Sequence, residues 1–197
     1  MEQLLAVITF GLANGMTPGP NNTLLMISGA TWGFTATLPH LLGVIIGFPL
    51  MVFAIGLGLG RLLGEWPVLH TALKAACAVW VAVVALRLLK TSKPGQQHAP
   101  GAKPISFWNA ALFQWVNPKA LVMAVTSAAL FIPVGSDMLE GIGIVSAGFF
   151  LAAIPSAVTW CLFGAMVSDF LNSEFRIRMF NIIMTLLLIV SMLPVIF

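Results

Sequence analysis

The stretch Thr17-Pro18-Gly19-Pro20-Asn21-Asn22 and its distant counterpart Gln114-Trp115-Val116-Asn117-Pro118-Lys119 decide the fold of this chain. Each lies inside a long apolar segment. Proline has no amide hydrogen and clashes with the carbonyl one turn back, and the residue before it avoids the helical region. Both segments are therefore predicted to be broken helices. In lipid such a break is tolerated only where it is buried in protein or lines a wet cavity, so the two stretches predict the walls of a binding site.

The composition is that of an integral membrane protein. The chain has 197 residues, of which 59% are hydrophobic and 8% charged, and its mean hydropathy is +1.02. A soluble domain carries roughly 25% charged residues. The net charge of +3 is too small to indicate nucleic acid as a partner, and no basic run with interleaved aromatic residues occurs. We therefore expect one transmembrane domain over residues 1–197, whose first apolar segment is retained because no charged signal-peptide region precedes it.

The fold class predicted is all-α, with six transmembrane helices. A bilayer core about 30 Å thick needs roughly 20 apolar residues per helix. The apolar segments of that length are Leu4 to Ala30, Leu38 to Gly60, Val68 to Leu89, Phe107 to Ile132, Gly141 to Val167 and Ile177 to Ile196. A polar loop over residues 91–105 separates a first half, 1–90, from a second half, 106–197.

The two halves follow one pattern. The first helix of each half carries a motif-like break, the second carries a central proline (Pro49 or Pro155), and the third has none in its interior. Because each half has an odd number of spans, the second half enters the membrane from the opposite side. The pattern therefore predicts two inverted three-helix repeats, a design of secondary transporters in which broken helices meet near the midplane.

The positions of Lys and Arg predict the orientation in the membrane. Four basic residues surround the central loop and place it in the cytoplasm, namely Arg87, Lys90, Lys93 and Lys103. Asp137 and Glu140, which have no basic neighbour, suit an external loop, and both termini then lie outside. The loop expected between the first and second helices, Thr31 to Leu38, carries no Lys or Arg. The orientation thus depends on the second half of the chain.

Several motifs resemble those of the lysine exporter and homoserine–threonine exporter superfamily. They are Pro18-Gly19-Pro20-Asn21, Gly33, Gly43-x-x-x-Gly47-Phe48 and Val116-Asn117-Pro118-Lys119-Ala120. The stretch Lys103-Pro104-Ile105-Ser106-Phe107-Trp108 is most similar to the branch that exports cysteine and O-acetylserine. The resemblance implies a multi-pass protein of the bacterial cytoplasmic membrane that exports amino acids or their derivatives, by proton antiport where this is known. The chain departs from the family in having Asn21 where many relatives have aspartate, and Cys77 and Trp80 where relatives often have Gly and Tyr.

The candidate substrate-binding residues are those of the two breaks. They are Thr17, Pro18, Gly19, Pro20, Asn21, Asn22, Gln114, Asn117, Pro118 and Lys119. Asn21 and Asn22 stand where a helix resumes, and its free amides and positive dipole end suit a carboxylate. Alternatively, these asparagines only satisfy the broken backbone. Lys119, the most deeply placed charge, either attracts a substrate carboxylate or exchanges a proton, or else it reaches free carbonyls or the membrane interface.

The function expected is export of a small neutral amino acid. No Asp or Glu lies within a predicted span, so a cationic substrate would lack a counter-charge, and proton coupling would use Lys119, His40, an end carboxylate or the substrate's amino group. Neither an enzyme's catalytic set nor a metal-spaced cluster occurs, and no cofactor is expected. A passive channel remains an alternative, as does a membrane thiol protein using Cys77 and Cys161. The expected partners are the amino acid, protons and membrane lipids, with homo-oligomerisation left open.

The predicted orientation is testable by cysteine labelling. With the native cysteines removed, Asp137→Cys in intact cells should react with a membrane-impermeant maleimide, whereas Gln97→Cys should react only after permeabilisation, because basic loops stay in the cytoplasm. Labelling of position 97 but not of position 137 from outside would reverse the assignment.

Overall fold

The computed structural model describes residues 1–59, 104–132 and 137–196, and separate positions between 71 and 89. The third predicted span falls largely outside the described residues, as does the loop 91–105 apart from its last two residues. The described residues form helices and no strand. These are α1 (Glu2–Gly15), α2 (Pro20–Ala54), η1 (Ile55–Leu59), α5 (Phe107–Val116), α6 (Pro118–Phe131), α7 (Met138–Ser168) and α8 (Glu174–Ile196). The all-α prediction is confirmed for this part of the chain.

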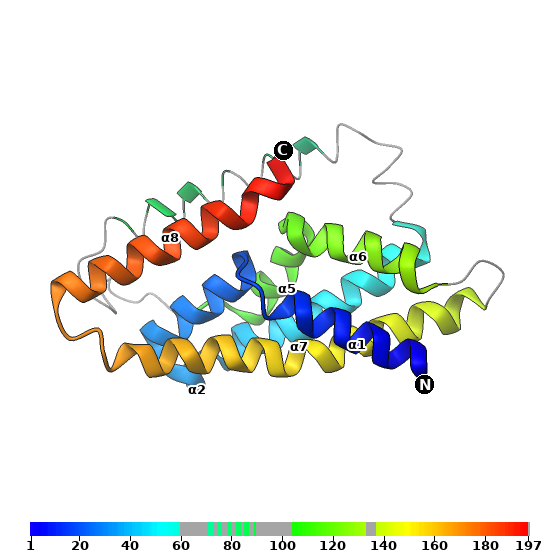
Figure 1. The fold of residues 1–197 in the computed structure, drawn as a ribbon, viewed down its shortest axis with the longest axis horizontal. Helices are drawn as coiled ribbons and strands as arrows, with labels where there is room; N and C mark the ends of the chain where they lie inside the picture. The colour runs from blue at the N-terminus through cyan, green and yellow to red at the C-terminus, as the bar shows by residue number, and fades with distance from the viewer. Residues whose placement is uncertain are drawn as a thin grey trace.

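The helices run mainly along the long axis of the molecule (Figure 1). α7 extends along the lower edge in this view, and α8 crosses the upper left at a slant. α2 packs most extensively against α7, and it also contacts α5. α1 lies against α7 as well. The pair α2 and α7 therefore forms the centre against which the shorter helices of both breaks are placed.

α2 consists of two legs that meet at Gly33. This glycine has φ 76° and ψ 171°, whereas its neighbours on both sides are helical. That backbone conformation is essentially restricted to glycine. The first leg runs to the left end of the molecule and the second returns to the right (Figure 1). The prediction of a loop over Thr31 to Leu38 is wrong, because a single glycine makes the turn and its carbonyl accepts a hydrogen bond from Thr37 Oγ1 at 2.7 Å.

Two glycines let α2 and α7 approach backbone to backbone. A methyl group built on Gly29 would overlap the carbonyl oxygen of Cys161, and one built on Gly164 would overlap the carbonyl oxygen of Met26. Small residues at a helix crossing permit close packing of the two backbones. In lipid this packing drives helix association, because the hydrophobic effect does not favour contact between helices over contact with lipid tails. The first leg of α2 is thus held against α7 by direct backbone contact.

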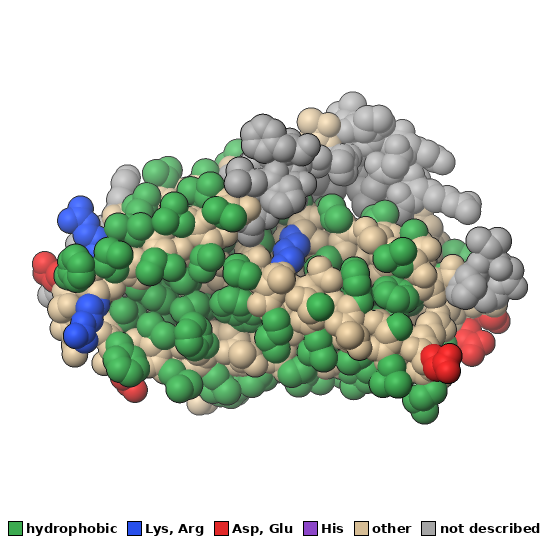
Figure 2. Space-filling model, in the orientation of Figure 1, with side chains coloured by type: hydrophobic (Ala, Val, Ile, Leu, Met, Phe, Trp, Pro, Cys, Tyr) green, Lys and Arg blue, Asp and Glu red, His purple; other side chains and the backbone are tan. Residues whose placement is uncertain are grey.

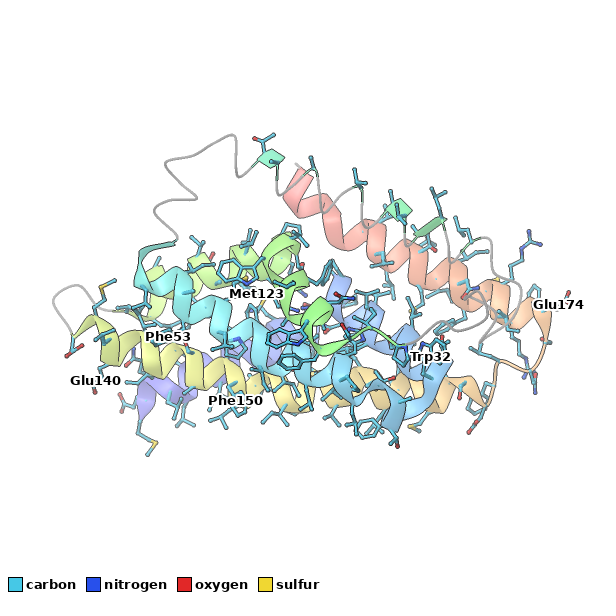
Figure 3. The ribbon with its side chains drawn as sticks, turned by 180° about the vertical axis from the view of Figure 1, so that it is seen from behind. Trp32, Phe53, Met123, Glu140, Phe150 and Glu174 are labelled. Atoms are coloured by element: carbon cyan, nitrogen blue, oxygen red, sulfur yellow. The ribbon has the colours of Figure 1, made fainter. Side chains whose placement is uncertain are left out.

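The outer surface is apolar between two charged ends. Large exposed side chains include Leu50 (62% exposed), Leu112 (64%) and Met166 (65%). Figure 2 shows many hydrophobic side chains on one face, with acidic groups near both ends, basic groups near the left end and one more basic side chain in the middle. In the opposite view, Glu140 and Glu174 lie at opposite ends of the molecule (Figure 3). Among the described residues, Pro20–Gly58 and Met138–Ser168 are long and apolar enough to cross a membrane. Such an apolar surface is suited to the hydrocarbon core of a bilayer.

Two alanine substitutions on α7 should separate close packing from helix propensity. Gly164→Ala should lower the free energy of unfolding by about 1–3 kcal/mol, because the added methyl meets the Met26 backbone. Gly143→Ala on the same helix has nothing within 4 Å of the added methyl, so it should be neutral or slightly stabilising. Thermal unfolding in detergent measures both, and equal effects of the two variants would contradict the packing argument.

Candidate substrate site at the helix breaks

The first break separates α1 from α2. α1 ends at Gly15, and α2 begins with Pro20 as its first helical residue, after Gly19 in an extended conformation (φ −174°, ψ 172°). Proline suits the first helical position because the amide that it lacks would have no intrahelical partner there. Pro18 and Pro20 thus end one helix and start another. The predicted interruption of the first apolar segment is confirmed.

The second break is a single residue. Asn117 ends α5 and begins α6, with φ −83° and ψ 105°, and Pro118 is the first residue of α6. A residue before proline is pushed out of the helical region, which explains the extended backbone of Asn117. The fourth predicted span is therefore present as two short helices, as the sequence indicated.

The two breaks are joined by a reciprocal amide pair. Asn21 Nδ2 donates to Gln114 Oε1 at 2.7 Å, and Gln114 Nε2 donates to Asn21 Oδ1 at 3.3 Å. Gln114 Nε2 also donates to the carbonyl oxygen of Ala110 at 2.8 Å. Because Gln114 is fully buried, loss of its partner would leave a costly unsatisfied amide. The start of α2 is thereby fastened to the last turn of α5.

Lys119 makes the opposite connection, from the start of α6 to the end of α1. Its ammonium lies 2.6 Å from Thr17 Oγ1, and it also donates to the carbonyl oxygens of Asn14 (3.1 Å), Thr17 (3.2 Å) and Pro18 (3.3 Å). These carbonyls lie at or just beyond the negative end of the α1 dipole. Lys119 thus places a positive charge where the first break leaves free acceptors.

Asn21 and Lys119 occupy equivalent positions. Each directly follows the proline that begins a helix, Pro20 or Pro118, and each reaches the helix that ends at the other break. Asn22 completes the arrangement, since its Nδ2 donates to the carbonyl oxygens of Gly15 (2.6 Å) and Thr17 (2.8 Å). Side chains therefore bind the carbonyl oxygens of Asn14, Gly15, Thr17 and Pro18 at the first break.

A cavity of about 70 Å³ lies between the breaks. At roughly 10–15 Å³ per water molecule, it has room for about five to seven waters. Its wall on one side is apolar, where the rings of Phe48 and Phe149 meet edge to face with centroids 5.1 Å apart. Met123, which also lines it, lies in the middle part of the molecule (Figure 3). The remaining lining residues are Gly11, Asn14, Gly15, Gly19, Pro20, Asn21, Asn22, Val44, Asn117, Lys119, Ala120, Ala152, Ala153, Ser156 and Ala157.

The cavity has one charged lining residue, Lys119. Of the described Lys and Arg residues, Lys119 alone lies away from the start of α8, and Figure 2 shows a basic side chain in the middle of the apolar face. The lining residues include no Asp or Glu. The amino-terminal ends of α2 and α6 both reach the cavity, and helix N-termini favour anions. A bound carboxylate suits these surroundings.

The structure brings most of the predicted site residues to this cavity. Six of them line it, namely Gly19, Pro20, Asn21, Asn22, Asn117 and Lys119. The others, Thr17, Pro18, Gln114 and Pro118, do not line it, although Thr17 and Gln114 hold residues that do. The sequence analysis missed the contributions of α7, including Phe149 and Ser156. For Ser156 a signal existed, because it follows Pro155 in the middle of its helix.

Comparison with known proteins identifies the family. The family model described as LysE type translocator matches residues 12–194. The chain belongs to this family. The resemblance predicted from the break motifs is therefore confirmed, and as a LysE type translocator the chain is a membrane transporter and not an enzyme.

Several relatives cover almost the whole chain. The cysteine/O-acetylserine efflux protein of Escherichia coli O157:H7 is 30% identical over 187 residues, which are 94% of this chain and 93% of the relative. The proteins of the same name from Escherichia coli strain K12 and Shigella flexneri are each 29% identical over the same shares. No solved structure matches this LysE type translocator significantly.

In the described part of the chain, no set of residues supports the other candidate chemistries. No group of three or more His, Cys, Asp or Glu side chains there is placed to hold a metal ion. Cys161 is buried and carries a free thiol. Cys77, the other cysteine of the chain, lies outside the described residues.

A double-mutant cycle should reveal the amide pair between the breaks. Asn21→Ala and Gln114→Ala should each lower the free energy of unfolding by about 1–3 kcal/mol, since each leaves the other amide without its partner. The double variant should fall short of the sum by about 1 kcal/mol. Ser168→Ala, which removes a local bond to Ala165, should add to Gln114→Ala without coupling. Unfolding in detergent supplies the values, and additivity of Asn21→Ala with Gln114→Ala would show that the pair is not formed.

Proposed function

We propose that this translocator exports a small neutral amino acid or derivative from the bacterial cytoplasm, with cysteine or O-acetylserine as the substrates to test first. The observation that carries the proposal is the small cavity between two helix breaks from opposite halves of the chain, without an acidic lining residue. The relatives' names support the substrate class, because they specify cysteine and O-acetylserine efflux.

The cavity suits a compact zwitterion. Its volume of about 70 Å³ favours a small amino acid or derivative over a large one. The rings of Phe48 and Phe149, with Met123, offer an apolar wall for a short side chain, and sulfur makes favourable contacts with aromatic edges. A lysine-like side chain would find no counter-charge among the lining residues.

The substrate carboxylate is proposed to bind at the starts of α2 and α6, near Asn21, Asn22 and Lys119. Helix N-termini and an ammonium group both favour a carboxylate. Lys119 now donates to oxygens of the first break, so an arriving carboxylate competes with them for the ammonium. Substrate binding would thereby loosen one of the two connections between the breaks. Loosening of this connection in the site would start the conformational change of alternating access.

The reciprocal contacts also support the predicted inverted repeats. Asn21 and Lys119 have equivalent places after their helix-starting prolines and bind the opposite half in the same sense. We propose that the chain is a multi-pass protein of the inner membrane, in which each half supplies one broken helix to a common site.

For proton antiport, the described residues offer Lys119 and His40 within the helices. His40 is buried on α2, where its Nδ1 lies 3.0 Å from Ser28 Oγ. It stands one turn from Val44, which lines the cavity. A carboxylate at a helix end or the substrate's own amino group is the alternative proton carrier. Export measured with and without a proton gradient tests the coupling.

A passive channel is the competing function, and a membrane thiol protein is a second one. Counterflow in proteoliposomes separates carrier from channel, because only a carrier accelerates uptake of labelled substrate when unlabelled substrate is inside. A panel containing cysteine, O-acetylserine, threonine and lysine identifies the substrate class. Equal permeation of all four without counterflow would refute the carrier.

Export should depend on both connections between the breaks. Lys119→Ala and Asn21→Ala should each reduce export by about ten- to a hundred-fold per inserted molecule, since a charge-assisted hydrogen bond contributes about 1.5–3 kcal/mol. Lys119→Arg should restore little, because a planar guanidinium cannot replace a compact ammonium among several oxygens.

The matched control is Arg178→Ala, which removes an exposed basic side chain at the start of α8. It should leave export unchanged. If both cavity variants insert normally and export at the parental rate, the breaks serve only as hinges and the substrate site lies elsewhere.

A further inference from the structure

Most polar side chains that line the cavity are already engaged. Asn14 Nδ2 donates to the carbonyl oxygen of Phe10 at 2.9 Å. Asn21, Asn22 and Lys119 donate to the groups described above. Two oxygen atoms of the lining residues are buried and have no hydrogen-bond partner, namely Asn117 Oδ1 and Ser156 Oγ. Asn117 and Ser156 are therefore the lining residues whose polar atoms stay buried without a partner.

Asn117 stands at a position where its side chain would normally be used locally. An asparagine before the first helical residue usually accepts a hydrogen bond from an amide of the first turn. Ser106 and Asp137 do this for α5 and α7. Asn117 makes no such bond to α6, although its side chain is only 2% exposed. Its oxygen is thus held buried and unused beside the cavity.

Ser156 has the same character on α7. A serine inside a helix commonly donates to the carbonyl one turn back, but Ser156 Oγ has no partner and the residue is 5% exposed. A methyl group built on Gly15 would overlap this oxygen, so the hydroxyl lies directly against the end of α1. Buried polar atoms without partners are rare in folded proteins, and two on residues that line one cavity point to a polar partner that the protein does not supply.

We propose that Asn117 Oδ1 and Ser156 Oγ form the subsite for the α-ammonium group of the substrate. This inference rests on the proposed function and assigns the other end of the same zwitterion. An ammonium group has three donors and no acceptor, so it matches two unpaired oxygens. The carboxylate then faces the starts of α2 and α6, and the short side chain faces Phe48 and Phe149. The subsite selects a free α-amino group and rejects deaminated or N-acylated analogues.

The test uses the full chain in detergent, with ligand affinity measured by the shift in thermal unfolding. The probes are cysteine and 3-mercaptopropionate, which differ only in the α-amino group. The parental protein should bind cysteine at least ten-fold more tightly. Ser156→Ala should weaken cysteine binding by about ten-fold and leave 3-mercaptopropionate unchanged, because one hydrogen bond to a charged group is lost.

Ser146→Ala is the matched control. Ser146 Oγ is also buried without a partner on α7, but this residue does not line the cavity and lies about 15 Å along the helix. Its replacement should change neither affinity. Asn117→Asp provides a second variant with the opposite expectation, since a carboxylate there should retain cysteine binding or strengthen it.

The outcomes separate this inference from the proposed function. If the parental protein exchanges cysteine in proteoliposomes but Ser156→Ala binds both probes as the parental protein does, the ammonium subsite is refuted and the exporter stands. If the parental protein binds cysteine no better than 3-mercaptopropionate, the subsite is refuted as well. If cysteine binds with the expected dependence on Ser156 but no amino acid is exchanged, the exporter fails while the subsite stands.

Discussion

The structure depends on one constraint, namely that every backbone group freed by a helix break inside an apolar protein needs a partner. The first break does not meet this requirement by itself. The carbonyls at the end of α1 are bound by Asn22 from the resumed helix and by Lys119 from the other half of the chain. The start of α2 is fastened to α5 through Asn21 and Gln114. Because unsatisfied groups are so costly in lipid, the two halves hold each other in place.

The same contacts explain why a transporter would retain such breaks. A continuous helix needs no partner and would not change its packing when a substrate arrives. A break whose acceptors are held by a mobile ammonium can exchange that partner for a carboxylate at modest cost, since charged hydrogen bonds replace one another. The cavity thus lies where backbone groups depend most on hydrogen bonds from side chains. The close contact of α2 with α7 at Gly29 and Gly164 supplies a fixed frame beside it.

The cavity combines features that come from distant parts of the chain. Its positive end is formed by the starts of α2 and α6, and its apolar wall by Phe48 and Phe149. The oxygens of Asn117 and Ser156 add acceptors that no protein donor meets. A zwitterion with a short side chain fits all of these features together. An anion alone would leave the acceptors unpaired, and a cation alone would face Lys119.

The sequence by itself determined that the chain belongs in a membrane, that it is helical, where both breaks lie and which family it belongs to. These follow from local rules, because proline ends helices wherever it stands and apolar length sets a span. It did not determine the turn at Gly33, where it predicts a loop, since one glycine suffices where the backbone can adopt a positive φ. Only the tertiary structure decided that Lys119 binds the first break and that Ser156 faces the cavity. Such contacts depend on which helix faces meet, and that is set by packing over the whole chain.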